Sequence, residues 1–250
     1  MKFPHKKAFK KSFNEIISTQ EGQQYGLDNY GRYFDTCTSI AHLIKKDAKM
    51  IDFGIYPGHL SLLIKHIFGV EITGISTTLT DTFSQNMADE HIPLLNIDLE
   101  KQKTPFTDNT FDYVLGSEII EHLYFPLNFL KEAFRTLKPG GFLIVTTPNL
   151  PRLKNRLNLF FRGKSVNPHL HGNEIVFSNN DWTHKREYTG AEVVKMLEAL
   201  GFKTCSIKYT PLLHYPNSFK KKIKNITKKA IYLFPAWKGG LICIGKKPEK

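Results

Sequence analysis

Short apolar segments alternate with helical segments through the middle of the sequence, and this alternation restricts the possible fold more than any other feature. Strands are predicted at residues 49–53, 70–75, 93–97, 111–115 and 142–146. Helices are predicted at residues 60–68, 80–88 and 126–137. Such a chain forms right-handed crossovers and a parallel sheet with helices on both faces. We therefore predict an α/β protein with a Rossmann-like fold.

The two ends of the chain depart from this alternation. Residues 1–48 are predicted to form a helical segment that precedes the main domain, residues 49–250. In the last third, "TGAE" at residues 189–192 is a capping box that begins a helix. Two strands remain, at residues 202–209 and 241–245. Since no strand–helix repeat lies between them, we expect an antiparallel pair.

Charge and cysteine content indicate the surroundings of the protein. The 250 residues carry a formal net charge of +12, which favours acidic partners such as phosphate, nucleic acid, anionic lipid or glycan, although it also serves solubility. No run approaches the roughly 20 apolar residues that span a bilayer, and the first residues lack the apolar core of a signal peptide. Cys37, Cys205 and Cys243 suggest neither a disulfide framework nor a zinc cluster. We therefore predict a cytoplasmic protein.

The sequence "IDFGIYPGHLSLL" (residues 51–63) predicts a strand, a glycine turn and a helix. In an open parallel sheet, ligands bind beyond the carboxyl ends of the strands. Gly54 lets the chain turn sharply beside a ligand, and Gly58 opens a helix whose amino end favours an anionic group. Asp52 could orient an ammonium group through a water. Alone, the pattern also fits a tight turn without a ligand.

A longer stretch, residues 96–149, resembles class I S-adenosylmethionine-dependent methyltransferases. The matching pieces are "DL" at residues 98–99, "PFTDNTFDYV", "EIIEHL", "LKEAFRTLKPGG" and "TTPN", in the family's order and spacing. The later "HKREYTGAEVVKMLEALGF" resembles the closing segment of many such enzymes. The resemblance covers about residues 45–210 and is strongest to the ubiquinone-biosynthesis O-methyltransferase group. It implies a mostly parallel sheet with an antiparallel last strand.

The resemblance also implies a binding site for S-adenosyl-L-methionine. Asp52, Gly54 and Gly58 would hold the methionine end of the cofactor. Asp98 would bond the adenine amino group, and Leu99 would supply a backbone amide.

Two cofactor positions depart from the family's pattern. The turn reads "GIYPG", in which Tyr56 and Pro57 stiffen the loop and Pro57 removes an amide donor. The second strand of the family ends in an Asp or Glu that accepts both ribose hydroxyls, whereas Ser76 stands here. Charge-assisted hydrogen bonds are about twice as strong as neutral ones. We expect weakened or rearranged binding, with Tyr56 and Ser76 at the cofactor and Asp81 as a substitute acid.

The sequence "SEIIEH" follows the fourth predicted strand, and the resemblance places Ser117 and Glu118 near the sulfonium and the acceptor. Glu118, Glu121 and His122 have the spacing of one helix face. Together with His184 they resemble a metal site of ubiquinone-biosynthesis and small-RNA ribose methyltransferases. Carboxylate ligands suit Mg²⁺ or Mn²⁺.

A site without metal is the alternative interpretation of the same residues. Many family members carry "E-x-x-E-H" with no known metal, so that Glu121 caps a helix and His122 packs or acts as a base. An imidazole has an ordinary pKa near 6.5, which suits proton removal at neutral pH. We therefore predict His122 and Glu118 as catalytic residues.

Two insertions, at about residues 150–188 and 211–238, provide surfaces for partners. The first mixes aromatic residues with arginines, and would cover a polar acceptor or pack as a simple lid. In the second, residues 218–238 are basic and amphipathic, and would lie on the anionic inner face of a membrane or pack on the sheet. We see no RNA-binding module, so we do not expect nucleic acid as a partner.

The sequence as a whole predicts an S-adenosylmethionine-dependent methyltransferase that acts on an oxygen of a small molecule, sugar or lipid-linked intermediate. One alternative is a catalytically silent member of the fold that serves as a binding partner, because Ser76 and the altered turn weaken the cofactor site. Another is a metal-dependent ribose methyltransferase for RNA ends, whose RNA binding would depend steeply on salt.

Overall fold

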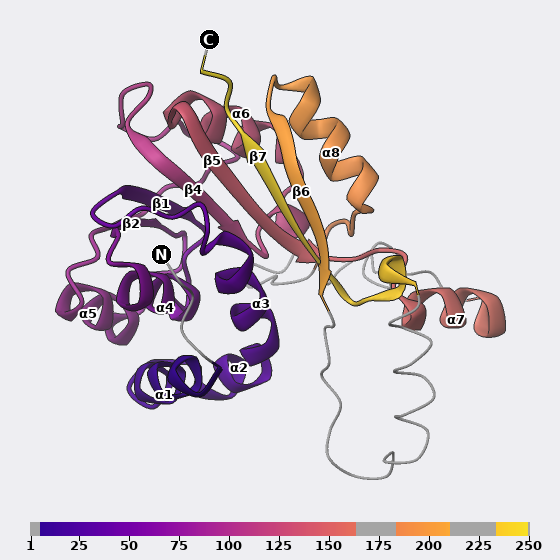
Figure 1. The fold of residues 1–250 in the computed structure, drawn as a ribbon, viewed down its shortest axis with the longest axis horizontal. Coiled ribbons are helices and arrows are strands. Elements are labelled where there is room, and N and C mark those ends of the chain that lie inside the picture. Colours follow the sequence, from indigo (N-terminus) through magenta and orange to yellow (C-terminus); the bar gives the residue numbers. More distant parts are fainter. Residues whose placement is uncertain (1–5, 164–183, 211–233, 250) are drawn as a thin grey trace.

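Seven strands form one sheet in the computed structural model, which describes residues 6–163, 184–210 and 234–249 (Figure 1). In chain order the strands are β1 (Lys49–Phe53), β2 (Glu71–Ile75), β3 (Leu94–Leu95), β4 (Phe111–Ser117), β5 (Leu137–Pro148), β6 (Lys203–Thr210) and β7 (Gly240–Lys246).

Across the sheet the strands follow the order β3-β2-β1-β4-β5-β7-β6. The five strands from β1 to β5 are parallel, and β7 runs antiparallel between β5 and β6. This arrangement confirms the predicted Rossmann-like sheet, mostly parallel and with an antiparallel last strand. The chain order reverses between β1 and β4, where open α/β sheets bind their ligands.

The described helices are α1 (Lys6–Ile17), α2 (Gln23–Asp28), α3 (Tyr30–Ile40), α4 (His59–Phe68), α5 (Asp81–Asp89), α6 (Pro126–Thr136), α7 (Leu153–Arg162) and α8 (Gly190–Ala199). Their ends follow local chemistry. Pro126 is the first residue of α6, where its missing N–H costs nothing. At α8, the Thr189 side chain accepts from the Glu192 amide and Glu192 reaches back, which confirms the predicted capping box.

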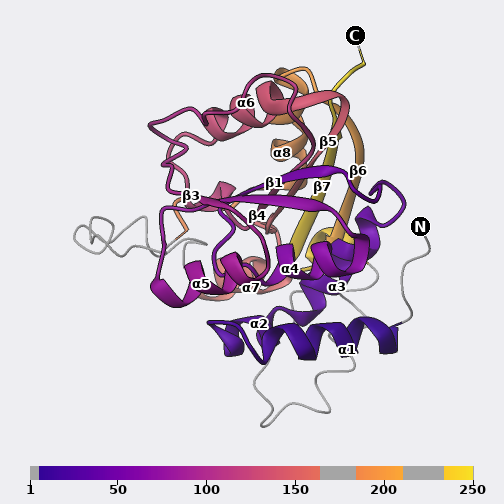
Figure 2. The ribbon, with the colours of Figure 1, turned by 90° about the vertical axis from the view of Figure 1, so that its left-hand side faces the viewer.

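Alternate residues of each strand point to opposite faces of the sheet and supply two apolar cores. One core packs Met50 and Leu115 against α1, α3, α4 and α5. The other packs Ile51 and Val114 against α6 and α8. Figure 2 shows this layering, with α6 and α8 above the sheet and α4 and α5 below it.

The helices before the first strand add an outer layer, with α1 and α2 below α4 in Figure 2. Phe9 and Phe13 of α1 are buried, and the Phe13 ring meets Tyr30 edge to face at a centroid distance of 4.8 Å. The helices predicted for residues 1–48 are therefore present, and they share a core with the main domain.

Two strands, β3 and β5, differ most in length from their predictions. Only Leu94 and Leu95 of β3 pair with β2. β5 begins at Leu137, earlier than predicted, because "LKPGG" continues as strand after α6 ends. Leu137 pairs with Phe111, and the Gly140 amide donates to the Lys247 carbonyl. The proline and glycines of "LKPGG" therefore follow the helix as part of the sheet and do not form a loop.

Large parts of both insertions, residues 164–183 and 211–233, lie outside the described residues. The predicted membrane segment 218–238 is therefore described only from residue 234 onwards. In the described ranges, no helix combines the length and the apolar character that crossing a bilayer requires.

Candidate functional site

The carboxyl ends of four neighbouring strands bring predicted site residues to one edge of the sheet. β1 leads to Gly54, β2 to Ser76, β3 to Asp98, and β4 ends at Ser117. Because these strands are adjacent and parallel, their ends face the same way. The topology therefore gathers the predicted cofactor residues where a ligand crevice is expected.

The glycine turn is closed on both sides by apolar side chains. Gly54 and Gly58 have left-handed φ angles of +85° and +89°. A Cβ at Gly54 would lie 2.8 Å from Ile119 Cδ1, and a Cβ at Gly58 would lie 2.8 Å from Met87 Cε. Both conformation and space therefore require glycine at these two positions.

Asp52 is buried beside this turn, and one of its carboxylate oxygens has no hydrogen-bond partner among the described residues. The Ser61 hydroxyl donates to Oδ2 at 2.6 Å, whereas Oδ1 is the unpartnered atom. Burial raises the pKa of Asp52 to about 7, and the bond from Ser61 offsets part of this rise. A buried acceptor without a donor is costly, so Oδ1 is suited to a ligand that donates.

Tyr56 turns toward α5. Its ring packs edge to face on Phe83 at a centroid distance of 5.1 Å, and its hydroxyl donates to Glu21 Oε1 at 3.1 Å. The Tyr56–Pro57 peptide bond is cis. The atoms nearest to the missing Cβ of Gly54 belong to Ile119 and not to Tyr56. The tyrosine ring therefore lies beside the turn and does not cover Gly54.

Ser76 is hydrogen-bonded within its own turn, because its Oγ donates to the Thr78 carbonyl at 2.7 Å and accepts from the Thr78 amide at 3.0 Å. A carboxylate reaches this corner from the N-terminal segment. Glu21 Oε2 accepts from the hydroxyl of Thr80, the N-cap of α5, at 2.5 Å. Asp81, the substitute acid considered from the sequence, is exposed in the first turn of α5. Sequence reasoning missed Glu21, since no local pattern links it to Thr80.

Asp98 follows β3 and has local partners. The Glu100 amide donates to Oδ1 at 3.0 Å, and Lys101 Nζ lies 2.8 Å from Oδ2. Burial opposes ionisation, but the contacts with Lys101 and Glu100 outweigh it and lower the pKa of Asp98. The Lys101 side chain is 80% exposed, so it can swing away from a ligand. Leu99 is buried in the core.

Glu118 lies just after β4 in a buried ion pair with Arg32 of α3. Arg32 Nη1 is 2.5 Å from Glu118 Oε2, and the two side chains are 7% and 12% exposed. The Thr146 hydroxyl donates to Glu118 Oε1 at 3.0 Å and lies 3.0 Å from Ser117 Oγ. Arg32 also donates to the Tyr25 hydroxyl. The sequence held no signal that this arginine would face Glu118.

The prediction that Glu118, Glu121 and His122 share one helix face is wrong. Glu118 has a φ of +53° and precedes a short 3₁₀ turn, η1 (Ile120–His122), so no α-helix runs through "EIIEH". Glu118 turns toward Arg32, whereas Glu121 bonds to a side chain of β5. The i, i+3, i+4 spacing brings side chains together only in an α-helix.

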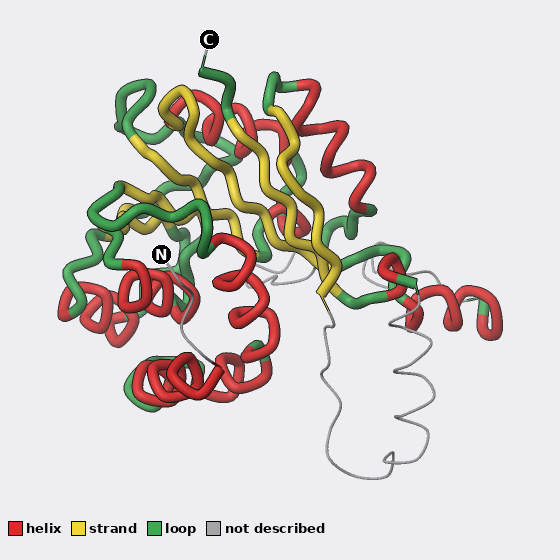
Figure 3. The backbone as a smooth tube through the Cα atoms, in the orientation of Figure 1, coloured by secondary structure: helices red, strands yellow, loops and turns green. Residues whose placement is uncertain are grey.

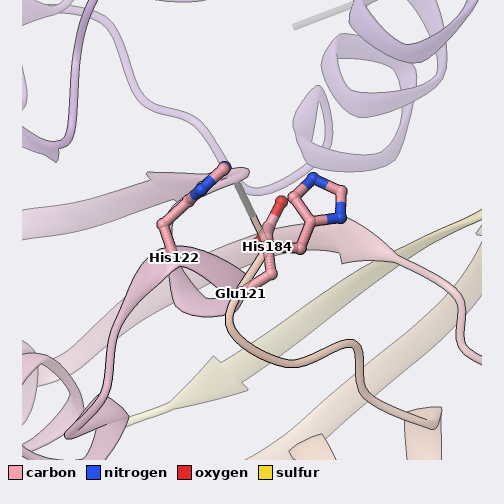
Figure 4. Close-up of side chains that lie close together, drawn as sticks. All are labelled: Glu121, His122 and His184. Atoms are coloured by element: carbon pink, nitrogen blue, oxygen red, sulfur yellow. The ribbon is translucent and has the colours of Figure 1, made fainter. Parts of the chain in front are cut away.

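Glu121, His122 and His184 converge beyond the end of β4 (Figure 4). One ligand atom from each residue lies within 4.8 Å of the others. Glu121 is fully buried, and the Thr147 hydroxyl donates to its Oε2 at 2.9 Å. Its Oε1 has no partner among the described residues. Burial, followed by the charge of Glu118, raises the pKa of Glu121.

Glu187 lies behind His184 and holds its ring. His184 Nδ1 is 3.3 Å from Glu187 Oε1, which also accepts from Arg152 Nη2 at 2.7 Å, and Asn155 donates to Oε2 at 3.0 Å. Burial opposes ionisation, but the contacts with His184, Arg152 and Asn155 outweigh it and lower the pKa of Glu187. A carboxylate behind an imidazole fixes the orientation of the ring. Glu187 is a positioning residue that sequence reasoning missed.

The site residues fit S-adenosylmethionine at its methionine end, and they fit a divalent cation in part. For S-adenosylmethionine, Asp52 Oδ1 and the amino end of α4 complement an ammonium and a carboxylate. Ser76 is neutral, so residue 76 offers no negative charge to the ribose hydroxyls of the cofactor. For a cation, one carboxylate and two imidazoles suit Mn²⁺ better than Mg²⁺, which prefers oxygen ligands. The unpartnered oxygen of Glu121 is available as a ligand atom.

The fold and the edge described above define a class of protein. Residues 25–207 match a family model described as a methyltransferase domain, which covers well over half of the chain. This chain belongs to the class I S-adenosylmethionine-dependent methyltransferase family, as its motifs predicted.

Two curated relatives illustrate the likeness. A demethylmenaquinone methyltransferase of Staphylococcus aureus is 30% identical over 178 residues, which cover 64% of this chain and 69% of the relative. A Mycolicibacterium smegmatis protein named "Probable S-adenosylmethionine-dependent methyltransferase" is 32% identical over 99 residues, which cover 40% of this chain. The match spans 31% of that second relative's length.

Solved structures share the fold at low identity. The Burkholderia thailandensis 1,6-didemethyltoxoflavin-N1-methyltransferase has a TM-score of 0.59 at 14% identity and covers 99% of this chain and 92% of its own. The cyclase SpnF has a TM-score of 0.58 at 16% identity and covers 88% and 82%. Since this fold also occurs in a protein named a cyclase, the reaction has to be argued from the site.

Proposed function

We propose that this protein transfers a methyl group from S-adenosylmethionine to an oxygen of a small molecule, sugar or lipid-linked acceptor. The observation that carries the proposal is the position of Glu121, His122 and His184. Glu121 and His122 follow β4, and His184 joins them from the segment before α8. β4 pairs directly with β1, and β1 leads into the glycine turn. A methyl donor held at the turn would therefore lie beside a cluster suited to proton removal.

In this proposal, residues of the chain bind the cofactor and orient it. The unpartnered Oδ1 of Asp52 accepts a hydrogen bond from an ammonium group, directly or through a water. Gly54 and Gly58 hold the turn beside the ligand in left-handed conformations that other residues rarely adopt. Glu21, which bonds Tyr56 and Thr80 on either side, supplies the negative charge that Ser76 lacks for ribose hydroxyls. When bound, the cofactor supplies a methyl group activated on a sulfonium.

The acceptor hydroxyl must lose its proton as it is methylated. His122 takes that proton in a metal-free site, since an imidazole titrates near neutral pH. In the metal-dependent form, Glu121, His122 and His184 would hold a divalent cation, which would lower the pKa of the hydroxyl. Glu187 keeps His184 in position in either form.

The relatives and the charge of the chain support a choice of acceptors to test. The Staphylococcus aureus relative is named for demethylmenaquinone, so this compound belongs in an acceptor screen with catechol-type and glycan-linked hydroxyls. A net charge of +12 favours an anionic or phosphate-linked acceptor. The cytoplasmic location stays a prediction.

The test is a two-stage experiment on the full chain. Calorimetry first measures binding of S-adenosylmethionine, and mass spectrometry then detects the gain of one methyl group across the acceptor screen, with and without EDTA. We expect His122→Ala to slow turnover by about 100-fold or more while cofactor affinity stays near that of the wild type. His42→Ala, at an exposed histidine after α3, is the matched control and should leave the rate unchanged.

Each outcome distinguishes one version of the proposal. No binding at millimolar cofactor would favour the silent member of the fold. An unchanged rate in His122→Ala removes that residue from the mechanism. Full activity in EDTA excludes both the metal-dependent form and the RNA ribose methyltransferase.

A further inference from the structure

Helix α7 (Leu153–Arg162) turns its polar side toward the protein and its apolar side away from it. Asn155 is 4% exposed and donates to the Leu150 carbonyl at 2.8 Å and to Glu187 at 3.0 Å. By contrast, Phe160 is 83% exposed and Phe161 is 73% exposed. A helix that merely packs on a protein core has the opposite arrangement.

Most of the apolar residues of α7 form one stripe. The partly buried Leu153 and the exposed Leu157, Phe160 and Phe161 have the spacing i, i+4, i+7 and i+8, which places them on one side of the helix. Leu159, which is 57% exposed, lies on another side. Leu157 is also largely exposed, at 44%. The sequence therefore provides a continuous apolar face that the described part of the protein does not cover.

Two basic side chains, Lys154 and Arg156, flank this apolar face. Both are exposed, as is Arg162 at the end of the helix, and the helix sequence "LKNRLNLFFR" contains no Asp or Glu. An exposed apolar stripe bordered by lysine and arginine is the pattern of helices that lie on anionic bilayers. A second copy of the chain would bring the same positive charges against one another, which disfavours a dimer through this face.

The position of α7 agrees with such a surface. The helix follows β5 at the carboxyl edge and projects from the body of the protein (Figure 1). The adjacent turn η4 (Pro235–Trp237) is tied to the end of β5, since Asn149 donates to the carbonyls of Ala236 and Lys238. Beside that turn Phe234 is 52% exposed and stacks on Trp237, which adds an aromatic pair of the kind found at membrane interfaces.

We propose that α7 docks this protein onto an anionic phospholipid surface, with Phe160 and Phe161 entering the boundary between headgroups and acyl chains. The helix has 10 residues and a length of about 15 Å, which is half the thickness of a bilayer core, so it lies in the interface and does not span. This site is distinct from residues 218–233, and it requires no methyl transfer.

The experiment is flotation of the full chain with vesicles of phosphatidylglycerol mixed with phosphatidylcholine, compared with phosphatidylcholine alone, in the absence of cofactor and acceptor. We expect binding to the anionic vesicles that weakens with salt. The double variant Phe160→Ser/Phe161→Ser should bind at least about tenfold more weakly, because two aromatic rings no longer leave water. Lys154→Gln/Arg162→Gln should lose most of the salt dependence.

Two controls keep the result specific. Leu27→Ser removes a leucine that is 53% exposed on α2 and should leave vesicle binding unchanged. The melting temperature of the double serine variant should equal that of the wild type, since both rings face outward. A fall in its melting temperature would mean that the chain itself covers the apolar face. A dimer of the wild type in light scattering that the variant abolishes would mean that a second copy covers it. Either result would overturn the proposal.

Equal binding to both vesicle types, no binding at all, or wild-type binding by the double serine variant would also overturn it. Because the assay contains neither cofactor nor acceptor, such a failure leaves the proposed methyl transfer intact.

Discussion

The two halves of the carboxyl edge are assembled from the sequence in different ways. The cofactor half centres on Asp52, the glycine turn and Ser76, which belong to one short stretch of chain and make mostly local hydrogen bonds. The acceptor half joins Glu118, Glu121 and His122 with two segments far away in the chain, one that carries Arg32 and one at residues 184–187. A sequence motif can therefore locate the cofactor half, whereas the residues of the acceptor half come together only when the chain folds.

The halves also differ in how they hold their charges. Asp52 is buried with a hydroxyl as its described partner, and no cation compensates it among the described contacts. In the acceptor half, Arg32 neutralises Glu118, and Arg152 neutralises Glu187. Removing the charge of Asp52 should therefore stabilise the protein, whereas removing that of Arg32 should destabilise it.

The largest expected effect is on stability in the acceptor half. Arg32→Gln leaves Glu118 buried without its cation, and we expect it to lower the free energy of unfolding by about 3–5 kcal/mol. The matched control is Arg186→Gln, because Arg186 pairs with Glu192 at the surface and its side chain is 60% exposed. That control should cost less than about 1 kcal/mol. Urea unfolding measures both, and equal costs would contradict the buried ion pair.

An intermediate effect tests the cofactor half through pH. The pKa of Asp52 is about 7 in the folded protein and near 3.9 in an unfolded chain. Between these two pH values Asp52 is protonated only in the folded state. Its contribution to the free energy of unfolding therefore falls as pH rises from about 4 to about 7. Asp52→Asn carries no such proton.

The stability of the wild type relative to Asp52→Asn should therefore fall with rising pH, by up to about 1.4 kcal/mol per pH unit in that window, and level off above it. Taking the difference between the two proteins cancels the other titrating groups. A difference that does not change with pH would show that Asp52 is ionised throughout.

The smallest effect concerns the corner where the N-terminal segment meets the cofactor half. Glu21→Gln keeps the shape of the side chain but removes its charge, and we expect S-adenosylhomocysteine to bind about tenfold more weakly in calorimetry. Glu15→Gln, on the exposed side of α1, is the control. An analogue without ribose hydroxyls should bind the wild type and Glu21→Gln equally well. Wild-type affinity in Glu21→Gln would leave Ser76 as the ribose contact.

The fold was predictable to the extent that local chemistry determines it. Strand β1 and the capping box of Thr189 and Glu192 follow from residues that are neighbours in the chain. The glycine turn was predicted too, because Gly54 and Gly58 mark it directly. These features do not depend on which distant segments pack against them.

The rest of the site could not be predicted, because it depends on packing between remote segments. Glu21 meets Thr80 only once the N-terminal helices cover α4. Glu187, which contacts His184 directly, is held by Arg152 from a remote part of the chain, and no sequence spacing predicts that ion pair. Even within "EIIEH", the left-handed backbone of Glu118 separates residues that a helical pattern would unite.

The contact between Gly54 and Ile119 means that the two halves cannot act independently. Ile119 fills the space that a side chain at residue 54 would need, and it immediately precedes the 3₁₀ turn that carries Glu121 and His122. Any side chain introduced at residue 54 would have to displace this isoleucine, and the shift would pass along one peptide link into the turn that carries Glu121 and His122. The packing of one half of the edge is therefore set by a residue of the other half.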